Sequence, residues 1–390
     1  MNTLFSISRP HRIEVPFIKA TFGGVDFGFS SKKNPVTGVI GSNFIKSLNV
    51  EKYGSGAVNT YTLVMKYVIE PDDDPNFVDM VISKATDRKI FFTYGDISQP
   101  EYSYKNEEAI ITSIVPQVDY KNNTITYTIK ATSSTTLSYA VKRTFAATTG
   151  QPSQEIIKIL YNNDYGLLDL LPGMRDKEKV LAKGWIPTGD KVVSISEKKD
   201  MAPMDYILYL VSLMVGSNNC YYFLKVMDQR DQEQPHFEIV STEQKSKSQM
   251  LTIDVGYPGS VTVFNFEVSE NSSTPLLVEY RDKIDSGLLK DYSFRGDLIS
   301  KNYYSSETVN GDYSTNLRNW WNKMKSFPLT ATLITQGIYV PAEIIQSIYI
   351  NTYFFGKKYW HSGEYLIMSQ NDSISEAGYR TTLGLMRIGE

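Results

Sequence analysis

The sequence contains very little cysteine. Cys220 is the only cysteine among 390 residues, and a single cysteine cannot form an intramolecular disulfide, so nothing in the chain indicates an oxidising compartment. Cys220 lies in the segment NNCYYFLKV, beside strand-forming aromatic residues. We expect it to be a small buried hydrophobic residue.

Patterns that bind metals are also missing. The three histidines, His11, His236 and His361, lie far apart without ligand spacing, so we expect surface or locally hydrogen-bonded side chains. The acidic run at residues 72–74 lacks the alternating ligands, central glycine and distal glutamate of an EF-hand loop. Acids at a helix start complement the helix dipole, which explains the run more simply. The sequence predicts no metal and no cofactor.

No hydrophobic run is long enough to cross a bilayer. The most apolar segment, MDYILYLVSLMVG from Met204, is shorter than the roughly 20 residues that a spanning helix needs, and we predict a core helix. The first residues, MNTLFSISRPHRIEV, reach Arg9 and Pro10 too soon for a signal peptide. We therefore expect a protein made in the cytosol, with no stable membrane insertion.

Clustered positive charge is absent as well. The formal net charge is -3 and no basic cluster occurs, whereas a protein that grips nucleic acid needs a basic stripe to displace counterions. A surface that DNA merely passes needs no such stripe. The charge pattern is therefore the same for a protein past which DNA moves and for a protein that never meets DNA.

Catalytic motifs are missing too. The segment GWIPTGDKV at residues 184–192 resembles a phosphate loop, but Asp190 follows the second glycine where the motif requires lysine. No serine lies in a GxSxG motif, and Cys220 has no histidine near it in the sequence. We name no catalytic, cofactor-binding or metal-binding residues and expect the protein not to be an enzyme.

Aromatic residues are abundant, with 27 Tyr and 18 Phe. Such residues suit half-buried strands and subunit interfaces. We predict a mainly β fold with α+β insertions, in three regions at residues 1–147, 148–250 and 251–390.

The first region alternates apolar and polar residues in NTYTLVMKYVIE, which predicts a strand with Tyr61, Leu63, Met65 and Tyr67 on one face. A helix capped by Asp74 is expected next. The strand KIFFTYGD and a hairpin, AIITSIVPQVDY and TITYTIKATSS, complete the region.

The second region predicts a small α+β unit. QPSQEIIKILYNNDYG is expected to form a short helix, and Asp200 is expected to cap a helix that contains Tyr206 and Val215. The strands KVVSIS, NCYYFLKV and HFEIV complete this unit.

The third region returns to strands, SVTVFNFEVS, LLVEYRD, TATLITQG and IIQSIYINTYF, with a helix at STNLRNWWNKMKS. It closes with a hairpin whose strands cover residues 363–369 and 379–388, joined by a polar turn in NDSISEAG. A strand that reaches the terminus must be held by a sheet. Two β regions, each with a hairpin and an inserted helix, suggest a loose internal duplication.

The closing segment GEYLIMSQNDSISEAGYRTTLGLMRI resembles the final hairpin of phage baseplate hub proteins, the central tail hub family. YTLVMKYVIEPDDDPNFVDMVISKA, FFTYGD and YTIKATSS resemble the first region of the same family, and APMDYILYLVSL resembles its small α+β unit. The chain also resembles the hub part of type VI secretion spike proteins.

This resemblance implies two tube-like β-barrel domains flanking a small α+β domain. It implies a homotrimeric ring with pseudo-six-fold symmetry that joins the hexameric tail tube to the tail spike or tip and lines the central channel. The implied partners are the tail tube protein, a separate spike or tip protein and the tape measure protein, with DNA only as passing cargo. The implied location is the virion tail baseplate, assembled in the host bacterial cytoplasm. Residues 118–127 and 370–379 are the candidate contact segments.

Two other classes of function remain open. A host-surface or carbohydrate-binding β protein of a phage tail would use Trp320, Trp321 and Trp360 as stacking platforms, although their sequence positions suit core packing better. An enzyme whose active-site residues are dispersed in the sequence is the third alternative.

Overall fold

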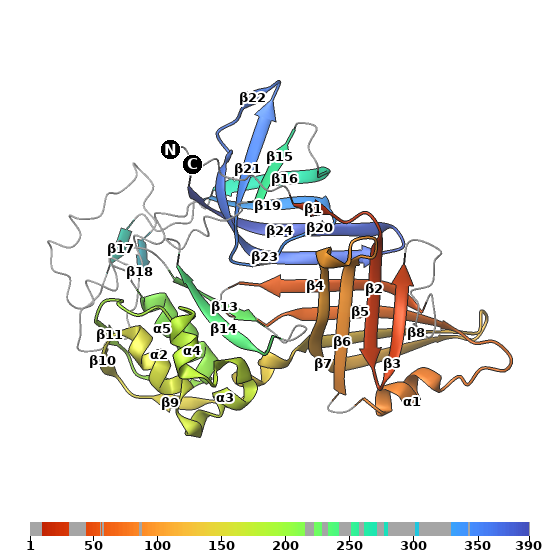
Figure 1. Cartoon of the computed structure of the whole chain (residues 1–390), viewed down its shortest axis with the longest axis horizontal. Helices are drawn as coiled ribbons and strands as arrows, with labels where there is room; N and C mark the ends of the chain where they lie inside the picture. The colour runs from red at the N-terminus through yellow and green to blue at the C-terminus, as the bar shows by residue number, and fades with distance from the viewer. Residues whose placement is uncertain are drawn as a thin grey trace.

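The computed structural model consists mainly of one large sheet with a small α+β unit beside it (Figure 1). It describes residues 10–30, 44–54, 56, 58–85, 88–214, 222–227, 233–241, 251–256, 261–270, 277–279, 301–303, 329–341 and 344–389. The predicted helix at STNLRNWWNKMKS and Cys220 lie outside these residues.

The main sheet has 14 strands, in the order β16-β19-β24-β23-β4-β5-β8-β7-β6-β2-β3, and β21 joins it through β23 and pairs with β15 and β22. The early part of the chain contributes β2 (Pro16–Phe22), β3 (Val25–Ser30), β4 (Ile45–Tyr53), β5 (Thr60–Val68), β6 (Lys89–Asp96), β7 (Ser103–Asp119) and β8 (Thr124–Ser133). The late part contributes β15 (Leu251–Val255), β16 (Val263–Glu270), β19 (Leu329–Gln336), β21 (Ser347–Phe354), β22 (Lys357–Lys358), β23 (Gly363–Ser375) and β24 (Gly378–Gly389).

Two short sheets accompany it. They pair β1 (His11–Arg12) with β20 (Ile338–Tyr339), and β17 (Leu277–Glu279) with β18 (Lys301–Tyr303).

The alternation seen in the sequence explains why β5 is a strand. Tyr61, Leu63, Met65 and Tyr67 are buried on one face, as predicted, while the residues between them are partly exposed. Successive side chains in a strand point to opposite faces, so this alternation buries one face against the core.

The early and late parts of the chain meet in the middle of the main sheet, where β23 pairs with β4. β23 lies antiparallel to β4, with Ser369 opposite Tyr53 and Ser375 opposite Ser47. The hairpin β23–β24 therefore flanks the central pair β4–β5 on one side, and the hairpin β7–β8 flanks it on the other. This arrangement holds the closing hairpin within the sheet.

Helix α1 (Phe77–Ser83) covers one end of this sheet, with Val78 and Val81 buried. Asp74 does not cap the helix as predicted. Its Oδ1 accepts the backbone N–H of Asn76 over 2.8 Å, so it closes the turn before the helix. The helix packs against the β2–β3 turn at Gly23, which has φ +57° and where an added Cβ would lie 2.1 Å from Val81 O.

The small α+β unit lies beside the sheet (Figure 1). Its helices are α2 (Pro152–Leu160), α3 (Leu167–Leu170), α4 (Lys177–Ala182) and α5 (Pro203–Leu213). Its strands are β9 (Arg143–Phe145), β10 (Thr148–Gly150), β11 (Val193–Ile195), β12 (Lys198–Met201), β13 (Tyr222–Met227) and β14 (His236–Ser241). Among the described residues, the short 3-10 helices are η2 (Pro100–Tyr102), η3 (Ser134–Tyr139), η4 (Asn163–Tyr165) and η5 (Pro172–Met174).

The prediction that Asp200 caps α5 is wrong. The residue before the helix is Ala202, no side chain caps it, and Asp200 lies in β12 with φ +51°. Pro203 occupies the first turn, where its missing N–H leaves one fewer donor to satisfy.

The described residues form three hydrophobic cores. The first lies under β2 to β8 and also includes Ile374 and Tyr379 of the closing hairpin. The second fills the α+β unit, and the third lies among the late strands and includes Phe223. The predicted domain boundaries, 1–147, 148–250 and 251–390, stay a prediction.

The predicted fold class, mainly β with α+β insertions, is confirmed. The two tube-like barrels are not confirmed. Along the path of described strands, the main sheet ends at β16 and at β3 and does not close on itself. The barrels therefore stay a prediction.

Candidate functional site

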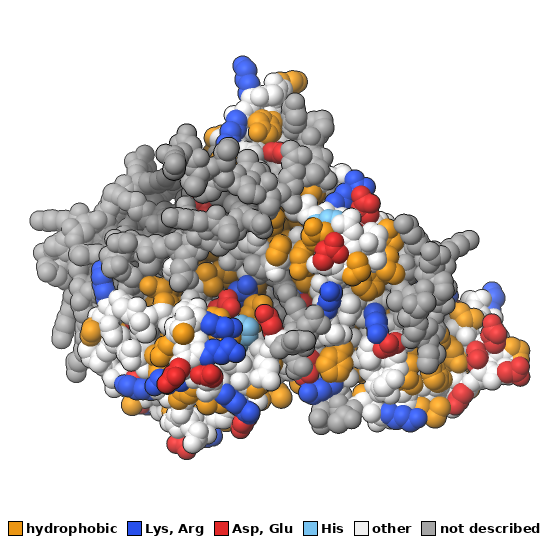
Figure 2. Space-filling view, in the orientation of Figure 1, with side chains coloured by type: hydrophobic (Ala, Val, Ile, Leu, Met, Phe, Trp, Pro, Cys, Tyr) orange, Lys and Arg blue, Asp and Glu red, His pale blue; other side chains and the backbone are white. Residues whose placement is uncertain are grey.

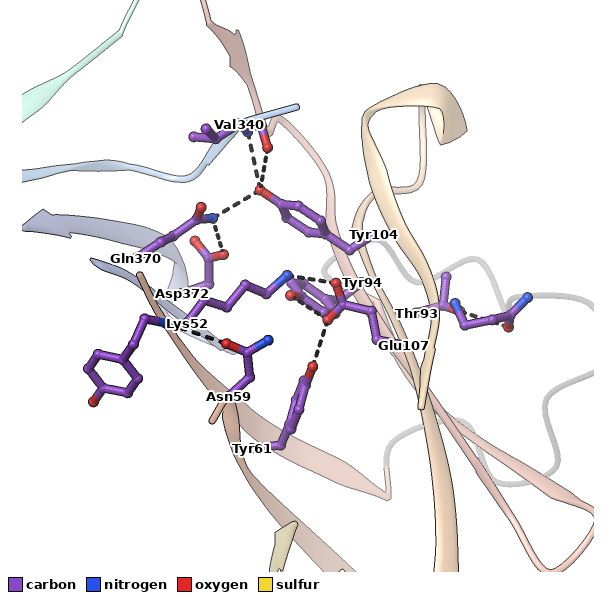
Figure 3. A network of polar contacts seen from close by, with 12 residues as sticks. Lys52, Asn59, Tyr61, Thr93, Tyr94, Tyr104, Glu107, Val340, Gln370 and Asp372 are labelled. Carbon is purple, nitrogen blue, oxygen red and sulfur yellow. Dashed lines mark hydrogen bonds and ion pairs between the residues drawn. The ribbon is translucent and has the colours of Figure 1, made fainter. Parts of the chain in front are cut away.

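A buried ion pair lies inside the main sheet (Figure 3). Lys52 on β4 and Glu107 on β7 have almost inaccessible side chains, and Lys52 Nζ lies 2.6 Å from Glu107 Oε1. Tyr61 and Tyr94 donate hydrogen bonds of 3.2 and 3.0 Å to Glu107 Oε2. A buried charge is tolerable only when it is paired and hydrogen-bonded, and this carboxylate meets both conditions.

Tyr104 connects this ion pair to the late part of the chain (Figure 3). Lys52 Nζ lies 4.1 Å from the centre of the Tyr104 ring, within the range of a cation–π contact. The Tyr104 hydroxyl accepts hydrogen bonds from Val340 N over 3.1 Å and from Gln370 Nε2 over 2.9 Å. One side chain of β7 therefore contacts both the early and the late strands.

Asp372 on β23 extends the network further. Its carboxylate accepts hydrogen bonds from Gln370 Nε2 over 2.6 Å and from Thr381 Oγ1 over 2.8 Å. The Thr381 hydroxyl in turn accepts the N–H of Ile338 over 3.2 Å. These side chains join the early strands β4, β5, β6 and β7 to the late strands β23 and β24, and we call them the junction network. Its members are Lys52, Tyr61, Tyr94, Tyr104, Glu107, Gln370, Asp372 and Thr381.

Burial dominates the electrostatics of the junction network. It raises the pKa of Asp372 to about 6, although the hydrogen bond from Thr381 and the ammonium of Lys52 act in the opposite direction. Burial also raises the pKa of Tyr94 and of Tyr104 well above the ordinary value, so both hydroxyls stay neutral. The network thus combines two carboxyl groups with one ammonium and several neutral donors.

The arrangement is suited to fixing strand register. The eight side chains come from six strands, β4, β5, β6, β7, β23 and β24. A slip of one residue in a strand would turn its side chains to the opposite face and leave buried charges unpaired. The junction network therefore holds the early and late parts of the chain in one alignment.

Sequence reasoning missed this network because it assigned residues 371–378 to a turn. The structure instead continues β23 to Ser375, and only Glu376 and Ala377 lie between the strands. Asp372 and Ile374 are fully buried on one face, so the polar run follows the period of a strand. The dense Asn, Asp and Ser that favour turns concealed that period.

Asp190, which departs from the phosphate-loop motif, has a structural role. Its buried carboxylate accepts hydrogen bonds from Ser153 N over 3.0 Å and from Ser153 Oγ, and its carbonyl accepts one from Gln151 Nε2. Ser153 lies in the first turn of α2, where backbone donors lack partners within the helix. Asp190 therefore caps α2 from a distant segment.

Each of the three histidines contacts nearby side chains, and His361 lies edge-on to the rings of Tyr359 and Trp360. His11 Nε2 lies 3.3 Å from Asp96 Oδ2, and His236 stacks on Trp185 with ring centres 4.0 Å apart. Within the described part of the chain, no group of three or more His, Cys, Asp or Glu side chains could hold a metal ion.

The two candidate contact segments differ in exposure. The tip of the β7–β8 hairpin is open to solvent, and Tyr120 is 86% exposed. By contrast, residues 370–379 lie mainly inside the sheet between β4 and β24, and Gln370 and Asp372 are buried. Trp360 is 56% exposed, while Trp320 and Trp321 lie outside the described residues.

No protein-family model matches the sequence, and no curated protein matches it either. Within the described residues, no helix is both long and apolar enough to span a membrane.

Solved structures match the fold along almost the whole chain. The tail protein from Neisseria meningitidis MC58 matches with a TM-score of 0.54 and 8% identity, over 95% of this chain and 96% of that chain. The 43 kDa tail protein of prophage MuSo2 from Shewanella oneidensis matches with a TM-score of 0.55 and 12% identity, over 95% and 98%.

A chain of the lidded PdpA–VgrG complex from Francisella matches with a TM-score of 0.50 and 11% identity. The match covers 96% of this chain and 53% of that chain. This protein therefore has the fold of phage tail proteins, which confirms the predicted resemblance at the level of the fold.

Proposed function

We propose that this protein is the structural hub of a phage tail baseplate and has no catalytic role. Three copies form a ring with pseudo-six-fold symmetry, which joins the hexameric tail tube to the spike or tip and lines the central channel. The observation that carries this proposal is the match to two tail proteins over 95% of this chain and nearly the full length of each.

The ends of the main sheet support a ring. Among the described strands, β3 pairs only with β2 and β16 pairs only with β19. Unpaired strand edges invite pairing with another chain, and head-to-tail contacts close into a ring when the rotation permits it. In the proposed trimer, the β16 edge of one copy faces the β3 edge of the next.

The two hairpins beside β4–β5 support the pseudo-six-fold symmetry. β7–β8 and β23–β24 flank this central pair on opposite sides, and in the proposed ring each copy uses both hairpins. Three copies then present six such units to a hexameric tube. The proposed partners are the tail tube protein, a spike or tip protein and the tape measure protein, while DNA only passes through the channel.

The location of the protein in the virion provides the test. The chain carries a peptide tag at its C-terminus, and antibody-labelled tails from particles that contain it are imaged by electron microscopy. We expect the label at the junction between tube and tip, in the baseplate. Label along the tube or on the head would contradict the proposal.

One observation favours the alternative of a host-surface or carbohydrate-binding protein. Trp360 is 56% exposed, and its neighbours Tyr359 and His361 surround it with further rings. Exposed indole rings can stack on sugars. Selective binding on a glycan array, lost in Trp360→Ala, would support this second candidate.

A further inference from the structure

The β21–β22 hairpin exposes a group of aromatic and basic side chains. Phe354, Phe355 and Trp360 are 60%, 105% and 56% exposed, and Lys357 and Lys358 are exposed between them. We call these five residues the aromatic tip. The hairpin projects away from the main sheet at the top of Figure 1, and Figure 2 shows lysine or arginine beside hydrophobic side chains there.

The backbone makes Phe355 an unfavourable choice for an isolated chain. Phe354 pairs with Lys357, so Phe355 and Gly356 form a two-residue turn with φ +48° and +77°. Turns with two positive φ values favour Asn-Gly, and a bulky residue there is strained. Full exposure gives the ring no compensating burial. Strain without burial indicates a partner that covers the ring.

A complementary surface lies at another end of the same molecule. Val68, Val118 and Tyr120 are 56%, 50% and 86% exposed. Ile69 N donates to Asn123 O over 2.8 Å, which places the segment after β5 beside the β7–β8 turn. The exposed acids there are Glu70, Asp72, Asp73, Asp74 and Asp119. Two lysines add positive charge, the exposed Lys121 and the partly exposed Lys66, whose charge acts on Asp119. We call this surface the acidic end, and Figure 2 shows its acidic and hydrophobic side chains together at the lower right.

The positions of the two surfaces fit a head-to-tail contact. The acidic end adjoins α1, which packs on the β2–β3 turn at the β3 edge of the sheet. The aromatic tip extends from β21, which lies in the part of the molecule that holds β15 and β16 (Figure 1). A ring that brings β16 of one copy to β3 of the next therefore also brings the tip near the acidic end.

We propose that the aromatic tip of one copy docks on the acidic end of the next copy of this chain. This inference rests on the proposed ring. Phe355 and Trp360 contact the exposed Val68, Val118 and Tyr120, and Lys357 and Lys358 face the acids. The contact is heterologous, so each copy uses one tip and one acidic end, and both are covered when the ring closes.

Phe355→Asn separates docking from folding. Asparagine before Gly356 suits the turn, so we expect the melting temperature of the dissociated chain to stay the same or rise. Loss of a central aromatic anchor should weaken association about tenfold or more. Native mass spectrometry over a concentration series measures the association, and an unchanged association constant would overturn the inference.

Charge exchange tests the identity of the receiving surface. Lys357→Glu/Lys358→Glu and Asp72→Lys/Asp73→Lys should each weaken association of the full chain, and the four changes combined should recover most of the loss. Lys179→Glu/Lys191→Glu, two exposed lysines of the α+β unit, is the matched control and should leave association unchanged.

The outcomes separate this inference from the proposed function. If the wild type is a trimer and every tip variant is an equally stable trimer, the docking is overturned and the proposed hub still holds. If the wild type is a monomer, both the docking and the proposed hub are contradicted. Binding of the wild-type chain to phosphatidylglycerol vesicles, lost in Lys357→Glu/Lys358→Glu without a change in association, would assign the tip to a lipid surface and overturn the inference.

Discussion

Asp372 shows how burial changes the behaviour of a single carboxyl group. In the sequence it lies among the polar residues of NDSIS, but in the structure it is fully buried on β23. Loss of solvation is the largest influence on its pKa and outweighs the hydrogen bond from Thr381 and the attraction of Lys52. Burial thus gives this aspartate a pKa of about 6, well above the ordinary value.

Asp372→Asn should remove a pH dependence of stability. The folded pKa of Asp372, about 6, lies above the ordinary value of 3.8, so its protonation favours the folded state. Its contribution to stability is fully present below about pH 4 and is lost as the pH rises through 6. The free energy of unfolding of the variant, relative to that of the wild type, should therefore increase by about 3 kcal/mol from pH 4 to pH 7. Urea denaturation at several pH values measures this, and a difference that does not change with pH would contradict it.

Glu107→Gln should be strongly destabilising, because it leaves the buried ammonium of Lys52 without its counter-charge. We expect a loss of about 3–5 kcal/mol in the free energy of unfolding. Asp26→Asn is the control, since the Lys19–Asp26 pair is partly exposed and should contribute at most about 1 kcal/mol. Equal losses for the two variants would argue against the junction network.

At the scale of elements, the sequence predicted strands with alternating apolar and polar residues correctly, but it did not predict the strand segment of β23 that consists mainly of polar residues. The alternation in β5 gave the correct buried face because Tyr61 and Leu63 belong to an uninterrupted apolar pattern. The extension of β23 was missed because its polar residues are held by distant parts of the chain: Gln370 donates to Tyr104, and residues 369–375 pair with β4. Long-range hydrogen bonds determine such positions, and no window of sequence contains them.

Gly23 and Gly24 provide a matched pair for the β2–β3 turn. Both have positive φ, but an added Cβ at Gly23 would lie 2.1 Å from Val81 O, whereas Gly24 has open space. Gly24→Ala should cost about 1 kcal/mol from backbone strain alone, and Gly23→Ala should cost at least about 2 kcal/mol more because α1 must move. Thermal unfolding measures both, and equal effects would mean that the helix does not pack on the turn.

Asp190→Ala should uncap α2. The carboxylate bonds Ser153 N at the first turn of the helix, so its removal should cost about 2 kcal/mol. Asp169→Ala is a suitable control, because Asp169 is 84% exposed in its pair with Arg175 and should contribute little. Equal melting temperatures for the two variants would contradict the cap.

At the scale of the whole molecule, the early and late parts of the chain share one sheet. β4 pairs with β23, and the first hydrophobic core includes Ile374 and Tyr379 from the closing hairpin. The sequence suggested two similar β regions but gave no sign that they join, because strand pairing across more than 300 residues leaves no local pattern. The fold class and the tail resemblance were predictable, whereas the junction network was not.

The oligomeric state of the purified full chain tests the central claim most directly. Native mass spectrometry, supported by light scattering, should give a species of three times the 44.2 kDa chain mass, formed more completely at higher concentration. A chain that remains monomeric at every concentration tested, with and without the tail tube protein, would contradict the trimeric hub.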